Sequence, residues 1–473
     1  MVQQVTSSKY YSGAISPLQS KNSATGENVQ HTKKAPYEKG SLLPYNLANV
    51  VPIVTKLSTP KDEKMYSELV NAIKHSNYDT SAQDGVSVAK KMDALLKSGK
   101  LLSSASNDGS TTLQNLYDIL NSPRCHNLDN LKIIAQTIDV LYNPAVITQN
   151  FGDIPDIVKS KILETGGADI PANILVNPSL MDVDGSGTCV AASVEFHMAN
   201  KHPAEFARWV SGLTSQNMEV EQKVRLEALS KNILDAVTFL DIFEVKQKDF
   251  NFEYTTLSLK PDDGAYIRAQ VQNNYWDRGE RTIVDVLMQS TLMQLGSQES
   301  YDSLSDFRAG KFSSNPQGLV ETEKTFIESI VENNEKLSIR YQKVDDNQNL
   351  IGWECDFDKI QKHIIDTLNI GEDVIIGYVL TNETSGKTKN PSYVNTPDNA
   401  PNKIINGHEI TIVGYKTDKN GKVTFICNDT DDDKSQLIEY TADFLIPKIH
   451  HAAYPVSIVE DDLALIEAQQ TAA

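Results

Sequence analysis

The feature that most constrains the fold is a change in hydrophobic period along the chain. From residue 62 to residue 166 apolar residues recur at steps of three and four, as in LDNLKIIAQTIDVLY, and this period predicts a series of short helices. In the last third the pattern changes to short runs rich in β-branched and aromatic residues, such as DVIIGYVL and HEITIVGY, which predict strands. Helices first and strands last indicate an α+β fold whose antiparallel sheet is strongly curved or closed as a barrel.

The middle of the chain combines both patterns. Helical spacing is found in three further segments: HPAEFARWVSGL, VEQKVRLEALSKNILDAVTFL and TIVDVLMQSTLMQLG. Strand-like alternation is found in two segments: FEYTTLSLKP and AYIRAQVQ. Further strands are expected near the C-terminus: KVTFIC, QLIEY and YPVSIV. The pair Asn420-Gly421 favours a tight hairpin between HEITIVGY and KVTFIC.

These patterns divide the 473 residues into five parts. Residues 1–45 are polar and without periodicity, so we expect a disordered tail. The others are, in chain order, a helical N-terminal region (46–165), a helical lobe with an inserted hairpin (166–320), an antiparallel β lobe (321–460) and a C-terminal tail (461–473).

The net charge of −19 excludes some classes of partner. Nucleic-acid binders present a basic face, and docking on anionic membranes also needs basic residues, so we expect neither partner. No window contains 18 apolar residues, and MVQQVTSSKYYSGAIS has no apolar signal-peptide core. We therefore expect a soluble protein that is cytoplasmic by default, with export by a route without a cleaved signal left open. The sequence predicts no oligomeric state.

The four cysteines are widely spaced: Cys125, Cys189, Cys355 and Cys427. They form no CxxC pair, so the sequence predicts neither a disulfide framework nor a zinc site built on thiolates. Cys189 differs from the other three in its surroundings, GSGTCVAASVEFHMA. Gly185 and Gly187 allow a tight turn, Thr188 is a suitable N-cap, and an apolar helical run follows. A cysteine at a helix N-terminus is favoured as a thiolate and therefore as a nucleophile.

A cysteine nucleophile needs a histidine on another element as its base. His408 is the strongest candidate, because it opens a predicted strand whose hairpin partner, VTFIC, ends in Asn428-Asp429. Either of these residues can accept the imidazole N–H and fix its tautomer. His197 lies on the same predicted helix as Cys189 but about two turns away, which is too far for a hydrogen bond. We interpret His197 as a surface or internally satisfied helix residue.

The order Cys189, then G-H-x(5)-G-Y around His408, then a strand ending in Asn or Asp resembles the papain-like cysteine peptidase superfamily. The pattern is most similar to bacterial relatives of the bacteriocin-processing peptidase group. It covers residues 177–200 and 370–458, under a third of the chain. The resemblance implies a papain-like fold in which a helical lobe carries the cysteine and a β lobe the histidine. It also implies a polypeptide substrate and neither a metal nor an organic cofactor.

Carried over by position, Cys189 resembles the nucleophile and His408 the general base. Asp429, which is followed by Thr430, fits the family's orienting residue better than Asn428 does. The family pattern has a glutamine six residues before the cysteine, where this chain has Val183. The second oxyanion donor must then come from another residue. The candidates are Gln149, Asn150 and Asn177.

The resemblance leaves two alternatives open. The same site can serve an amidase, a deamidase or a transglutaminase-type acyltransferase, which differ in the acceptor of the acyl group. The missing glutamine instead favours a catalytically inactive papain-like domain that acts as a binding module.

Overall fold

The computed structural model describes most of the chain beyond residue 52. The described ranges are 53–79, 84–125, 127–152, 154–165, 170–183, 187–226, 253–275, 280–297, 299–308, 318–347, 349–381, 404–431 and 435–471. The predicted N-terminal tail therefore lies outside the described residues, as does Gly185.

The first half of the structure is mainly helical. Its helices are α1 (Pro60–Lys74), α2 (Val88–Lys97), α3 (Thr112–Asn121), α4 (Asn130–Tyr142), α5 (Asp156–Thr165), α6 (Ala172–Val176), α7 (Cys189–Lys201), α8 (Pro203–Leu213), α10 (Asp263–Tyr275) and α11 (Ile283–Gly296). Two small hairpins accompany them, β1 (Val220–Arg225) with β2 (Tyr254–Leu259), and β3 (Tyr301–Asp302) with β4 (Phe307–Arg308). This part of the chain packs around one large apolar core, and a smaller one gathers α5, α6 and α10.

The second half carries the main sheet. Its strands are β5 (Lys336–Arg340), β6 (Gln342–Val344), β7 (Leu350–Trp353), β8 (Val374–Thr381), β9 (Ile404–Thr417), β10 (Val423–Asn428), β11 (Ile438–Thr441) and β12 (Ile449–Pro455). Its helices are α12 (Glu321–Glu332), α13 (Phe357–Asn369), α15 (Ala442–Leu445) and α16 (Leu463–Thr471). Six strands form an antiparallel sheet in the order β11-β10-β9-β8-β12-β5, while β6 and β7 form a separate hairpin. A second apolar core lies on this sheet under α13.

Local signals explain several of the predicted elements. Thr59 caps α1 by accepting from the Asp62 amide, and Thr111 forms a capping box with Gln114 at the start of α3. Gly421, with φ of +81°, closes the turn between β9 and β10, as the Asn-Gly pair predicts. The structure thus confirms an α+β fold with an antiparallel sheet.

Several expectations about individual elements are wrong. AYIRAQVQ belongs to helix α10, although its residues alternate as those of a strand do. VEQKVR, expected to open a helix, forms strand β1, because it pairs with β2 in full register from Val220 to Arg225. The rest of that predicted helix, from residue 227 to residue 240, lies outside the described residues. The expected β lobe contains α12 and α13, and the expected C-terminal tail contains α16.

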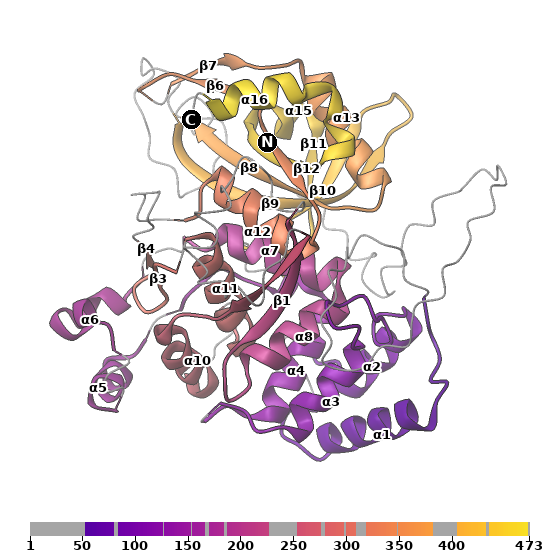
Figure 1. Cartoon of the computed structure of the whole chain (residues 1–473), viewed down its shortest axis with the longest axis vertical. Coiled ribbons are helices and arrows are strands. Elements are labelled where there is room, and N and C mark those ends of the chain that lie inside the picture. The colour runs from indigo at the N-terminus through magenta and orange to yellow at the C-terminus, as the bar shows by residue number, and fades with distance from the viewer. Residues whose placement is uncertain are drawn as a thin grey trace.

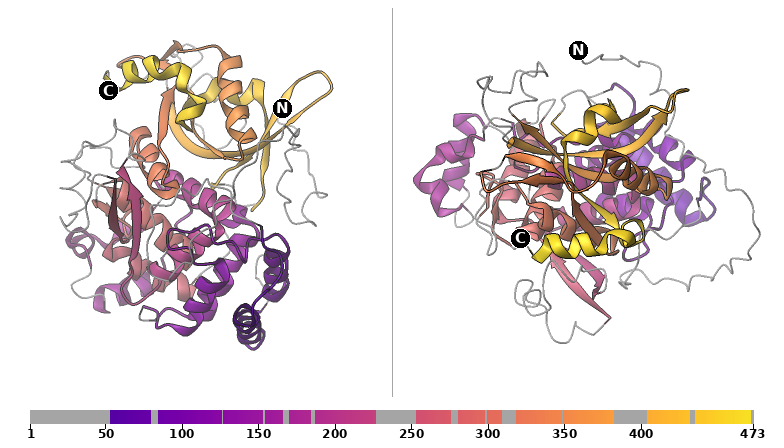
Figure 2. Two further views of the ribbon diagram at one scale, coloured as in Figure 1. Left: turned by 45° about the vertical axis from the view of Figure 1, so that its right-hand side comes forward. Right: turned by 90° about the horizontal axis from the view of Figure 1, so that it is seen from above.

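The two halves form two stacked lobes (Figure 1). The sheet with α13, α15 and α16 lies above the helical lobe, and α7 and α12 lie between them; the turned view in Figure 2 shows the same separation. In the described part of the chain, no helix combines the length and the apolar character needed to cross a bilayer. The site residues predicted from the sequence come from α7 and from β9 and β10, at the boundary between the lobes.

Candidate active site

Helix α7 places Cys189 at its first position. Ten consecutive residues of this helix, from Val190 to Ala199, are buried, whereas Cys189 is half-exposed. Thr188 occupies the N-cap position, but its hydroxyl donates to Gln289 Oε1 at 3.1 Å instead of accepting from the first turn. The first turn of a helix directs amides without helical acceptors toward its N-terminal end, so the thiol lies in a locally positive environment.

The chain reaches α7 through a tight contact at Gly187. A Cβ at this residue would lie 2.7 Å from the backbone nitrogen of Gly318, closer than packing allows. The Gly187 amide donates to Asp306 Oδ2, and the other oxygen of Asp306 accepts from the Tyr301 hydroxyl at 2.9 Å. The β3–β4 hairpin therefore fixes the position of the turn that carries Cys189.

His408 and Asp429 come from neighbouring strands of the main sheet. His408 is in β9, and Asp429 directly follows β10, whose last residue, Asn428, pairs with Thr411 of β9. The antiparallel register brings the two side chains together at one end of the strand pair. His408 Nε2 lies 2.6 Å from Asp429 Oδ1, and both side chains are at most one-fifth exposed.

The Cys189 side chain also acts on His408, as one of the groups that raise the pKa of its ring. Because Asp429 takes Nε2, the nitrogen left for the sulfur is Nδ1. Burial alone would lower the pKa of His408, but the Asp429 carboxylate and the interaction with Cys189 together raise this pKa well above its ordinary value. Burial would likewise raise the pKa of Asp429, yet His408 holds it below its usual range. The ring is therefore held as an imidazolium beside the sulfur.

Asn428, the other candidate for the orienting residue, does not contact His408 through a hydrogen bond in the described structure. Its side chain is buried, and neither its amide nitrogen nor its amide oxygen has a hydrogen-bonding partner among the described residues. The geometry therefore brings Cys189, His408 and Asp429 together and leaves Asn428 outside this group.

The loop after β10 is joined to the segment that contains Gln149. The Thr430 hydroxyl donates to Gln149 Oε1 at 3.1 Å, and the backbone N–H of Gln149 donates to the Thr430 carbonyl at 3.1 Å. One residue earlier, the Thr148 carbonyl accepts from Gln289 Nε2 at 2.9 Å. Gln289 also accepts from Thr188, the residue before Cys189. The segment 148–149 is therefore bonded on one side, through Gln289, to the start of α7, and on the other side to Thr430, the residue after Asp429.

Of the three sequence candidates for the second oxyanion donor, Gln149 is therefore the one that is connected to both sides of the site. Asn150 follows it, and its amide donates to the Thr148 hydroxyl at 3.2 Å. Asn177 lies exposed at the C-terminal end of α6.

Sequence reasoning did not find Gln289 and Asp306. Gln289 on α11 is fully buried and connects Thr188, Thr148 and Glu195 Oε2, the last at 3.0 Å. Asp306 is half-buried, and its Oδ2 accepts from the Gly187 amide. Neither residue is part of a local motif, because each contacts the site only through partners that are over ninety positions away in the chain. The sequence contains no signal that could have found them.

His197 is buried at the far end of α7, so the sequence expectation of a surface residue is wrong. The other alternative, a helix histidine with partners inside the protein, is right, because Glu332 and Asp373 face its ring.

Comparisons with protein-family models, with curated proteins and with solved structures find no match to this chain. The functional argument therefore depends on the geometry of the site.

Proposed function

We propose that this protein is a cysteine peptidase with a papain-like arrangement of its site, acting on a polypeptide substrate. The observation that carries this proposal is the position of His408, whose ring is shared between the Asp429 carboxylate and the Cys189 thiol. A nucleophile, a base and a group that orients the base are the three parts that nucleophilic catalysis by cysteine needs.

In this mechanism the Cys189 sulfur attacks the carbonyl carbon of the scissile peptide bond. The sulfur attacks as the thiolate paired with the His408 imidazolium, which gives its proton to the leaving amine, and an acyl-enzyme thioester remains. Water, deprotonated by the now neutral His408, then attacks the thioester, which releases the carboxylic acid and restores the thiolate and the imidazolium. Asp429 keeps Nε2 occupied throughout, so Nδ1 stays directed at the reacting atoms.

The oxyanion formed by this attack needs donors that are already in place. The backbone N–H of Cys189 at the start of α7 is one donor. We assign the second to Gln149, whose Oε1 is held by Thr430 and whose amide nitrogen is therefore the end available to substrate. Gln149 then performs the role that the family pattern gives to the position occupied here by Val183.

The experiment that tests the proposal combines thiol labelling with product analysis. At neutral pH an iodoacetamide probe should label Cys189 before Cys355, because burial raises the pKa of Cys355 to about 11. Cys189→Ala should abolish both labelling and cleavage of a peptide library, whereas Cys355→Ser should change neither. An inert Cys189 would contradict the peptidase proposal and favour a binding role.

Mass spectrometry of the products then separates hydrolysis from acyl transfer. A peptidase gives a carboxylic acid at a cleaved peptide bond whether or not an added amine is present. Transfer of the acyl group to the amine, or loss of ammonia from a glutamine side chain without chain cleavage, would replace the peptidase assignment with an acyltransferase or deamidase.

A further inference from the structure

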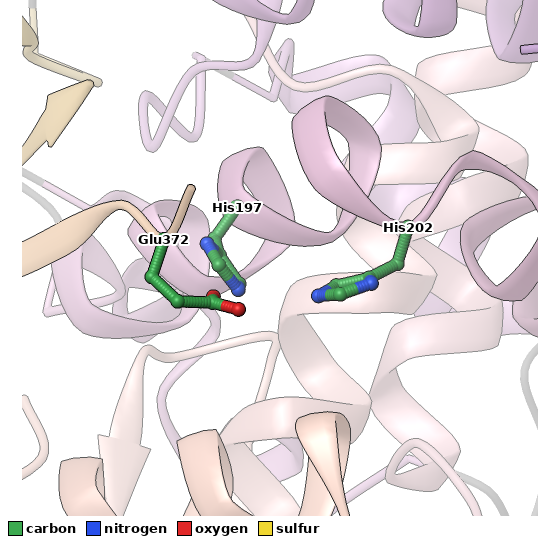
Figure 3. Close-up of side chains that lie close together, drawn as sticks. All are labelled: His197, His202 and Glu372. Atoms are coloured by element: carbon green, nitrogen blue, oxygen red, sulfur yellow. The ribbon is translucent and has the colours of Figure 1, made fainter. Parts of the chain in front are cut away.

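A second cluster of polar side chains lies at the end of α7 opposite Cys189. It consists of His197 on α7, His202 at the junction of α7 and α8, and Glu372 just before β8. Figure 3 shows the two imidazole rings and the carboxylate directed toward a common point. One ligand atom from each of the three lies within 4.8 Å of those of the other two.

The backbone at His202 explains why two histidines five positions apart meet. His202 is the C-cap of α7 and has left the helical conformation, with φ of −123° and ψ of 56°, and Pro203 then begins α8. The turn brings its ring back toward the preceding helical turn, where the ring centroids of His197 and His202 are 5.3 Å apart.

The polar atoms of His202 point to a missing partner. The residue is 4% exposed, and neither of its ring nitrogens has a hydrogen-bonding partner among the described residues. Oε2 of Glu372 is buried and also lacks a hydrogen bond there. A buried imidazole without a partner is costly unless something binds it.

His197 has the surroundings of a histidine that is oriented by carboxylates. Its Nε2 lies 3.0 Å from Glu332 Oε1 and its Nδ1 lies 3.6 Å from Asp373 Oδ2. Metal-bound histidines typically donate their other ring N–H to such a carboxylate, which fixes the tautomer and the ring orientation.

We propose that His197, His202 and Glu372 bind a divalent transition-metal ion, with Zn²⁺ as the ion that suits two imidazoles and one carboxylate. Zinc accepts these donors in tetrahedral geometry, with water available for the fourth position. Ligand atoms around tetrahedral zinc are roughly 3.3 Å apart, so the three side chains need only rotate inward by about 1 Å. The ion takes the place of the proton on His197, and that proton leaves to solvent.

The position of this site suggests a structural role. His197 is eight residues beyond Cys189, or about 12 Å along the helix axis, so the ion does not contact the reacting atoms. It would join α7 of the helical lobe to the strand β8 that pairs with β9. The same junction is already tied by Asn200, which donates to Asp373 Oδ2 at 2.9 Å, and by Lys201, which donates to the Gly371 carbonyl at 2.8 Å.

A second group in the described chain has a similar composition but fits a metal less well. It contains Glu321, His450 and His451. Both oxygens of Glu321 already accept, one from Ser338 at 2.6 Å and the other from Arg340 at 3.1 Å. His451 also faces Glu409 at 3.3 Å. This group therefore supplies a control for the test.

The test uses the full chain carrying Cys189→Ser, so that zinc cannot bind through the thiol and the result does not depend on the proposed function. After removal of bound metal with a chelator, calorimetric titration with Zn²⁺ should show one site, and zinc should raise the melting temperature. Co²⁺ should give the absorption of a tetrahedral site without sulfur-to-cobalt charge transfer, as nitrogen and oxygen ligands require.

Variants assign the ligands. His202→Ala and the nearly isosteric Glu372→Gln should each weaken Zn²⁺ binding by about 100-fold or more, while His450→Ala should leave it unchanged. The Glu372→Gln variant also decides the question if His202→Ala fails to fold. Absence of one-to-one binding, full affinity in Glu372→Gln, or loss of binding in His450→Ala would each overturn the proposal.

Discussion

His408 is the residue on which the proposed chemistry depends, because its ring contacts both the nucleophile and the group that orients it. The Asp429 carboxylate raises the pKa of His408 and so keeps a positive charge beside the Cys189 sulfur. That charge stabilises the thiolate, and the same bond to Nε2 prevents the ring from turning away.

We therefore expect Asp429→Asn to lower kcat by about 100-fold or more and to slow the alkylation of Cys189 at neutral pH. The reason is that the variant lowers the pKa of His408 and removes the imidazolium at neutral pH. Asn428→Ala is the matched control, because its side chain makes no hydrogen bond in the described structure. Slower alkylation at neutral pH in Asn428→Ala, and not in Asp429→Asn, would show that Asn428 and not Asp429 orients the histidine.

Gln149 permits a separate test of the oxyanion site. Gln149→Ala should lower kcat by about 100- to 1,000-fold, because one prepositioned donor is lost. The rate of Cys189 alkylation should stay near that of the wild type, since no oxyanion forms in that reaction. Asn177→Ala should retain full activity. Equal loss of alkylation and of turnover in Gln149→Ala would mean that the residue only supports the loop around Thr430.

The sequence could predict those site residues that lie in a recognisable motif of neighbouring residues. Cys189 is marked by a glycine-rich turn before a helix, and His408 and Asp429 by two strands joined through a recognisable hairpin. Gln149 could be named only as one of three candidates, because its link to Thr430 joins positions 281 apart.

At the scale of elements, α7 is unusual because a carboxylate lies in its buried middle. Glu195 is fully buried and its Oε2 accepts from Gln289. Its carboxyl group interacts with that of Asp285, and as carboxylates neither Glu195 Oε1 nor Asp285 Oδ1 has a donor among the described residues. Burial raises the pKa of both groups, that of Asp285 to about 6. A proton shared between them satisfies both oxygens.

This arrangement predicts how the stability of α7 depends on pH. A carboxyl whose pKa is raised on folding contributes stability below its ordinary pKa and loses it as pH rises toward the folded value. The wild-type free energy of unfolding should therefore fall with rising pH, by up to about 1.4 kcal/mol per pH unit for one proton. Glu195→Gln supplies a neutral amide of the same shape and should flatten this slope. Denaturant unfolding of both proteins between pH 5 and 8 measures this slope. An equal slope in Glu195→Gln and in the wild type would show that the proton is bound by other groups.

The turn before α7 leads to a prediction about packing. Gly187→Ala should destabilise the protein by about 1–3 kcal/mol and slow the alkylation of Cys189, because the new methyl group would displace the Gly318 backbone. Gly414→Ala in β9 is the control, since its Cβ would lie 3.7 Å from Ile426 Cδ1, an ordinary contact. Chemical denaturation and labelling rates measure both effects. A neutral Gly187→Ala would show that this turn tolerates movement.

The elements that sequence reasoning found are those with their own start signals or continuous β-branched runs, such as α3 and β8. The elements that it misread or missed depend on partners elsewhere in the chain. Strand β1 is a strand because β2 pairs with it, and α10 is a helix because residues such as Ile267 pack into the third core. Helix α12 was missed because charged side chains interrupt its apolar pattern, and these side chains are buried in ion pairs.

At the scale of the whole molecule, a buried ion pair joins α12, which packs into the large helical core, to the main sheet. Lys324 of α12 is fully buried, and its ammonium donates to Glu409 Oε2 at 3.0 Å and to the Ile375 carbonyl at 3.3 Å. Glu409 directly follows His408, and its carbonyl accepts from Ser193 of α7 at 3.4 Å. The alignment of Cys189 with His408 is therefore supported by charged groups that have no access to water.

Removing Lys324 tests this connection. Burial alone would raise the pKa of Glu409, but Lys324 and His451 lower it to about 2. A carboxylate of this kind contributes stability above its ordinary pKa near 4.5 and loses it as pH falls toward 2. Lys324→Met should therefore cost about 3–5 kcal/mol at pH 7, because Glu409 keeps its buried charge and loses a partner. The cost should shrink below pH 4.5, where protonation of Glu409 relieves it.

The control is Lys416→Met, which removes a similar pair with Glu439 from an exposed position. Its effect should stay within about 1 kcal/mol at every pH, because water screens an exposed pair. Denaturant unfolding of the three proteins from pH 7 to pH 3 gives the comparison. A Lys324→Met penalty that is small, or that stays constant across this range, would show that packing and not the buried charge pair holds the lobes in register.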